Sequence, residues 1–113
     1  MEVYHELGPG LLEGIYERAL MCELKARGLN CANQVPVEVK YKGIDLQSTL
    51  RLDILVEDCI ILELKSVEVV LPVHKKQLIT YLKLTGKRLG YVVNFCVEDI
   101  CTSSAIIRIA NKL

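Results

Sequence analysis

Three charged residues near the middle of the chain, Asp53, Glu63 and Lys65, are each embedded in a run of Leu, Ile and Val. Asp53 lies within TLRLDILV (49–56), and Glu63 and Lys65 lie within CIILELKSV (59–67). An unpaired charge buried among Leu, Ile and Val costs roughly several kcal/mol even after relaxation. We therefore expect these three groups either to compensate one another or to form a site with a chemical purpose.

The spacing of these residues brings them onto one patch if the two stretches form a hairpin. Glu63 and Lys65 are two residues apart and project from the same face of a strand. In a hairpin centred on Asp58, Asp53 falls opposite Glu63, because each is five positions from the turn. The other face is then predicted to be apolar and to consist of Leu50, Leu52, Ile54, Ile60, Leu62 and Leu64.

Two carboxylates and an ammonium group at this spacing suit a hard divalent cation. Magnesium takes oxygen ligands, keeps several waters and needs only one or two carboxylates. Bound between Asp53 and Glu63, it would polarise a phosphate oxygen and acidify an attacking water. Lys65 would orient that water or offset charge on the phosphorus. The alternative is a salt-bridged triad without a catalytic role, but an aspartate at hairpin register favours a site.

The remaining sequence predicts the elements that must position these groups. A short helix is broken at GPG (8–10), and Pro72 and Gly86 bound a later helix. The predicted elements follow the order αβββαβ. This order is typical of an α/β (α+β) fold with a central mixed sheet flanked by helices. The predicted elements are a helix over 11–27, strands over 34–41, 49–56 and 59–67, a helix over 73–84, a strand over 89–95, and a strand or short helix over 104–110.

Length and composition indicate one domain, over residues 1–113. Half of the 113 residues are apolar and a quarter are charged, which is enough for an aliphatic core. No stretch approaches the roughly 20 apolar residues needed to span a bilayer, and MEVYHEL lacks the pattern of a signal peptide. We expect a cytoplasmic protein with no membrane partner, and scattered cysteines that are reduced and mostly buried.

The formal net charge is zero, but the charges are unevenly distributed. Residues 66–91 contain five basic residues and a single acid, Glu68, whereas residues 1–26 contain five acids and two basic residues. Lys75, Lys76 and Lys83 are therefore candidates to hold a phosphate backbone. A solvated helix face is the alternative interpretation.

Longer motifs connect these residues to a known family. The run RLDILVEDCIILELK resembles the D-(x)9-E-x-K core of the PD-(D/E)XK nuclease superfamily, and Gly10, Glu13 and Tyr16 match the signature of its GxxExxY family. ELGPGLLE, VPV…YKG, PVHKKQLITYLKLTG and VNF are also similar to that family. The resemblance covers essentially the whole chain and implies a restriction-endonuclease-like core. Met1 falls inside the first short helix, where family members commonly have further residues, so this N-terminus is expected to be short.

The resemblance implies roles for further residues. Gln77 and Tyr81 match the Q-x-x-x-Y spacing of RecB-like members, where the pair borders the active site. Glu13 matches a carboxylate that many members add to the metal shell. His5 is not assigned to the site, and His74 is expected to serve at a helix start rather than as a ligand. The implied set is Asp53, Glu63, Lys65, Gln77 and Tyr81 as catalytic residues, and Asp53, Glu63 and Glu13 as ligands of Mg²⁺ or Mn²⁺.

Together these observations favour a metal-dependent nuclease that hydrolyses DNA rather than RNA with low sequence specificity. The neutral charge and small size leave an alternative, a non-catalytic nucleic-acid-binding or interaction module that retains the nuclease fold. A purely structural oligomer subunit ranks last, because it would leave the charged triad unexplained. An exposed sheet edge at 34–41 or 104–110 makes a homodimer a reasonable expectation.

Overall fold

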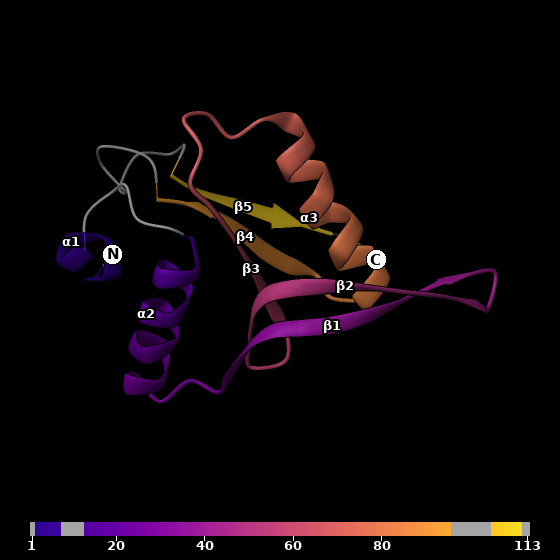
Figure 1. Cartoon of the computed structure of the whole chain (residues 1–113), viewed down its shortest axis with the longest axis horizontal. Coiled ribbons are helices and arrows are strands. Elements are labelled where there is room, and N and C mark those ends of the chain that lie inside the picture. The colour runs from indigo at the N-terminus through magenta and orange to yellow at the C-terminus, as the bar shows by residue number, and fades with distance from the viewer. Residues whose placement is uncertain (1, 8–12, 96–104, 112–113) are drawn as a thin grey trace.

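A five-stranded mixed sheet forms the centre of the protein, whose computed structural model describes residues 2–7, 13–95 and 105–111 (Figure 1). Neighbouring strands pair in chain order, with β3 and β4 parallel and the other pairs antiparallel. The predicted fold class is thereby confirmed. The strands are β1 (Cys31–Tyr41), β2 (Ile44–Val56), β3 (Ile60–Lys65), β4 (Leu89–Asn94) and β5 (Ile106–Ala110).

Helices cover both faces of this sheet. Helix α2 (Glu13–Ala26), preceded by α1 (Glu2–Leu7), packs against one face, and α3 (Pro72–Thr85) packs against the other. Because alternate strand residues point to opposite faces, successive residues of β4 enter different cores. Val93 lies in the cluster with Leu20 of α2, and Val92 lies in the cluster with Leu78 of α3.

Close contact between α3 and β4 depends on Gly90. A Cβ atom at this position would lie 2.9 Å from Leu78 Cδ1 and 3.0 Å from the Ile61 carbonyl oxygen. A glycine therefore lets the helix approach the sheet at this point.

Two hairpin turns join β1 to β2 and β2 to β3, and the second confirms the hairpin predicted at Asp58. Lys42 and Gly43 have φ values of 51° and 80°, and Glu57 and Asp58 have values of 52° and 56°, as turns with two left-handed central residues require. The predicted hairpin register is confirmed between β2 and β3, where Ile54, Leu55 and Val56 pair with Leu62, Ile61 and Ile60.

The apolar face predicted for this hairpin is correct in part. Ile54 and Leu64 are buried against α2, with Ile60 and Leu62 packed beside them. The prediction is wrong for Leu52, which is buried in the cluster on the α3 side, and Leu50 borders the same apolar pocket as Leu52 and Tyr81. The regular alternation of β2 is therefore interrupted between Leu52 and Ile54, at Asp53.

Several element boundaries differ from those predicted. β1 and β2 begin earlier, because they pair along one long hairpin that extends beyond the rest of the sheet (Figure 1). The undecided segment 104–110 contains a strand, β5, because its residues pair with β4 from Leu89 to Val93. β1 and β5 are the two edges of the sheet, as expected, whereas the GPG break at 8–10 lies outside the described residues.

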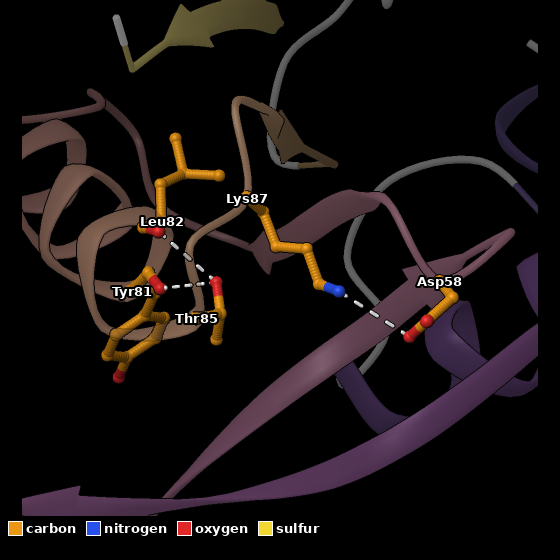
Figure 2. Close-up of polar contacts among 5 residues, drawn as sticks. All are labelled: Asp58, Tyr81, Leu82, Thr85 and Lys87. Atoms are coloured by element: carbon orange, nitrogen blue, oxygen red, sulfur yellow. Dashed lines mark hydrogen bonds and ion pairs between the residues drawn. The ribbon is translucent and has the colours of Figure 1, made fainter. Parts of the chain in front are cut away.

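The C-terminal end of α3 is closed by local hydrogen bonds (Figure 2). Thr85 Oγ1 donates to the carbonyl oxygens of Tyr81 and Leu82, at 2.8 and 3.3 Å. Gly86 follows in the left-handed conformation with a φ of 70°, as predicted from a glycine at this position. Lys87 then reaches the β2–β3 turn, with its Nζ 3.5 Å from Asp58 Oδ1. Because Asp58 is highly exposed, this ion pair adds little to stability.

The cysteines are less buried than predicted. Cys22 and Cys59 are exposed and Cys31 is half-buried, and all three are free thiols. Cys22 follows the buried Met21 on α2, and Cys59 follows the β2–β3 turn, so both lie at the surface. Cys96 and Cys101 lie outside the described residues. Within the described ranges, no helix has the length and apolar character needed to cross a bilayer.

Candidate active site

A cleft of about 300 Å³ opens between α2, α3 and the central strands. It brings together side chains that are far apart in the sequence, including every predicted catalytic residue. The lining residues are Glu13, Gly14 and Glu17 of α2, Gln34 of β1, Arg51 and Asp53 of β2, Glu63, Leu64 and Lys65 of β3, and Gln77 and Tyr81 of α3.

Asp53 and Glu63 lie next to each other in this cleft. The Leu64 backbone N–H donates to Asp53 Oδ2 at 2.8 Å, and the Asp53 backbone N–H donates to Glu63 Oε1 at 3.4 Å. Each carboxylate is therefore oriented by the backbone of the other's strand. The pairing predicted from hairpin register places the two groups side by side.

Burial and mutual repulsion make this pair reluctant to carry two charges. Glu63 is only 4% exposed, and its burial, together with the charge of Asp53, raises its pKa to about 8. Burial also raises the pKa of Asp53, although the hydrogen bond from Leu64 opposes this change. Near neutral pH, the pair is therefore stabilised by a proton or by a cation.

Lys65 is held by two successive hydrogen bonds that involve side chains of α3. Its Nζ donates to Gln77 Oε1 at 3.2 Å, and Gln77 Nε2 donates to the Tyr81 hydroxyl at 2.9 Å. Gln77 and Tyr81 are four residues apart and so share one helix face. Burial, followed by the charge of Glu63, raises the pKa of Tyr81, which keeps its hydroxyl protonated.

The two motif residues of α2 have different locations. Glu13 lines the cleft, and its pKa is raised by burial and by Asp53, while Lys65 and His74 oppose this effect. Tyr16 is instead fully buried in the core and stacks on Phe95, with ring centroids 4.1 Å apart. Gly10 lies outside the described residues.

His74 has the structural role expected of it. Its backbone N–H donates to the Leu71 carbonyl oxygen, and its Nδ1 accepts the Leu71 backbone N–H at 2.9 Å. This reciprocal pair satisfies backbone groups at the start of α3.

The three candidate phosphate-binding lysines do not line the cleft. Lys76 and Lys83 are exposed on α3, and Lys75 is half-buried there. Gln77 and Tyr81 occupy the side of α3 that borders the cleft, so the lysines extend from other sides of the same helix. The cations that do line it are Lys65 and Arg51.

Three polar or charged cleft residues, Glu17, Gln34 and Arg51, were not singled out from the sequence. Glu17 follows Glu13 by four residues on α2, a spacing that places both on one helix face and could have indicated it. Arg51 precedes Asp53 by two residues on the same strand, which is a similar signal. Nothing in the sequence indicated Gln34, whose φ is 50°.

The donor set of the cleft is compatible with magnesium or manganese. In the described part of the chain, no three His, Cys, Asp or Glu side chains are grouped as a metal site. Magnesium commonly uses one or two carboxylates and completes its shell with waters. Asp53 and Glu63 supply two such groups, and burial, with a smaller contribution from neighbouring carboxylates, raises the pKa of each, so a cation would favour their charged forms.

Comparison with known proteins identifies a family for the chain. The model of a family described as the PD-(D/E)XK nuclease superfamily matches residues 1–109. No curated protein and no solved structure matches the chain.

Proposed function

We propose that this chain, which belongs to the PD-(D/E)XK nuclease superfamily, hydrolyses phosphodiester bonds of nucleic acid with the help of Mg²⁺ or Mn²⁺. The observation that carries the proposal is the pair of carboxylates, Asp53 and Glu63, side by side in one cleft with Lys65. Lys65 Nζ is hydrogen-bonded to Gln77, and among the described residues it forms no ion pair with either carboxylate, which argues against a salt-bridged structural triad.

The chain's residues divide the work of such a reaction. Asp53, Glu63 and Glu13 would hold the cation, and the bound ion would supply Lewis-acid polarisation of the phosphate. Lys65 would orient the attacking water and offset developing negative charge. Gln77 and Tyr81 would act as positioning residues, because their hydrogen bonds hold Lys65 in place.

The expected substrate is DNA, bound without base specificity. Arg51 lines the cleft and is exposed, so it can contact a phosphate next to the scissile one. Lys76 and Lys83 on α3 could hold phosphates farther along the strand. Such contacts carry affinity but no sequence information.

A cleavage assay tests this function directly. We expect labelled single- or double-stranded DNA to yield products with Mg²⁺ or Mn²⁺, to yield none with EDTA, and to be cut faster than RNA of matched sequence. The Lys65→Ala variant, purified in parallel, controls for contaminating nuclease. Salt-sensitive binding of DNA without products in either metal would contradict the proposal and favour a non-catalytic binding module.

Removal of the Gln77 side chain is expected to slow cleavage without weakening metal binding. Gln77→Ala deprives Lys65 of its 3.2 Å acceptor, and a misplaced catalytic group can cost up to about 100-fold in rate. Tyr81→Phe is the matched comparison and should have a smaller effect, because the Gln77–Lys65 contact remains. Single-turnover rates and Mn²⁺ titrations of both variants would measure this. Equal loss in both variants would show that Gln77 does not act through Lys65.

A further inference from the structure

Glu17 is a buried carboxylate at the rear of the cleft. It is 8% exposed and accepts two hydrogen bonds from β1, from Asn33 Nδ2 at 3.2 Å and from Gln34 Nε2 at 2.5 Å. Both amide donors belong to exposed residues, so they could be hydrated without this partner. The contact therefore joins α2 to one particular point of β1.

That point is an irregularity in the strand. Gln34 has a φ of 50°, a left-handed conformation that residues other than glycine, asparagine and aspartate seldom adopt. It persists where the surrounding structure holds it. The hydrogen bond to Glu17 is made by the side chain of Gln34 itself.

The irregularity lies directly across from Asp53. Gln34 and Asp53 lie between the flanking pairs Asn33–Ile54 and Val35–Leu52. Leu52 packs on the α3 side of the sheet and Ile54 on the α2 side. Residues two apart in a regular strand would point to the same side, so the alternation of β2 is broken at this step. Strict alternation after Leu52 would turn Asp53 toward α2, away from Gln77 and Tyr81.

We propose that Glu17 is a positioning residue that keeps Gln34 in its left-handed conformation and thereby directs Asp53 into the cleft beside Glu63. Its effect on metal binding rests on the proposed function, whereas its effect on the orientation of Asp53 does not. Glu17 also lines the cleft, and its charge acts on Asp53 directly, so the substitutions at Gln34 are needed to distinguish that effect from the one through the backbone of β1.

Substitutions at position 34 distinguish the hydrogen bond of the Gln34 side chain from the conformational preference of the backbone at this position. Gln34→Ala and Gln34→Gly both remove the amide, but glycine adopts positive φ without steric cost. We expect Gln34→Ala to reproduce the defect of Glu17→Ala. Gln34→Gly should retain the geometry of the cleft, and should restore it when combined with Glu17→Ala.

The Leu64 amide provides a readout that needs no metal. It donates to Asp53 Oδ2 at 2.8 Å, so its proton chemical shift and exchange rate report the position of that carboxylate. In Glu17→Ala and Gln34→Ala we expect an upfield shift and faster exchange, and in the double variant a return to the wild-type values. Mn²⁺ affinity should fall by about 10- to 100-fold and recover in parallel.

Glu23→Ala is the matched control, because it removes from the same helix a carboxylate that is paired with Arg27. The proposal is overturned if the chemical shift and exchange rate of the Leu64 amide stay at their wild-type values in Glu17→Ala, as they are expected to do in Glu23→Ala. It is equally overturned if Gln34→Gly fails to rescue, since Glu17 would then act on the site as a ligand or as a charge. If the wild type binds no metal and cuts nothing, the proposed function fails, but the Leu64 amide still decides this inference.

Discussion

Replacement of Asp53 by alanine is expected to abolish both metal binding and cleavage, whereas Lys65→Ala should abolish cleavage alone. Asp53 lines the cleft beside Glu63, and magnesium commonly uses only one or two carboxylates, so the loss of one should be severe. Lys65 offers no oxygen to a cation but faces the same space. For either variant we expect the rate of cleavage to fall by at least about 10²- to 10³-fold.

Calorimetric titration with Mg²⁺ and Mn²⁺ measures the binding half of this prediction. Wild type and Lys65→Ala should each bind about one equivalent, because the metal site proposed here has Asp53 and Glu63 side by side in one cleft. Asp45→Ala is the control, since Asp45 is an exposed aspartate on the same strand whose carboxylate accepts the nearby Gln47 backbone N–H. Undiminished binding by Asp53→Ala would exclude Asp53 as a ligand.

The metal-free protein is expected to lose stability as the pH rises from about 4.5 to 8. Glu63 has a pKa of about 8 in the folded protein against an ordinary value of 4.5, so the folded state binds its proton more tightly than the unfolded state. The stabilisation is complete below pH 4.5 and is lost as the pH approaches 8. At about 1.4 kcal/mol per pH unit, the loss is at most about 5 kcal/mol.

Thermal unfolding in EDTA across this pH range tests the prediction. A loss of a few kcal/mol corresponds to a decrease in Tm on the order of 10 °C for a domain of this size. Glu63→Gln should flatten the pH dependence, because an amide has no proton to release, and Glu23→Gln should leave it unchanged. Parallel curves for wild type and Glu63→Gln would show that Glu63 is not the group responsible. Added Mg²⁺ should stabilise the wild type more at pH 8 than at pH 6, since the cation replaces the missing proton.

Local sequence patterns predicted which of the candidate residues come together in the cleft. The position of a turn determines which residues face each other across a hairpin, so Asp58 was enough to pair Asp53 with Glu63. The four-residue spacing of Gln77 and Tyr81 likewise determines that they share a helix face. These are consequences of backbone geometry over a few residues, and the structure agrees with them.

Other features of the cleft were beyond such patterns. The lysines of α3 were identified by charge alone, and charge does not say which side of a helix meets a cleft. The face of the sheet on which Leu52 lies was predicted wrongly, because strict alternation was assumed through Asp53. Alternation is a reliable guide only while each residue remains in the extended conformation.

The sequence by itself determined the order of elements, the turns and the identities of Asp53, Glu63 and Lys65, since periodicity and turn chemistry are local. Only the tertiary structure decided that Glu17 meets Asn33 and Gln34, and that the strand becomes irregular at that point. A glutamine carries no local preference for a left-handed backbone. That conformation depends on a helix and a strand packing together, and this contact arises only when the whole sheet has formed.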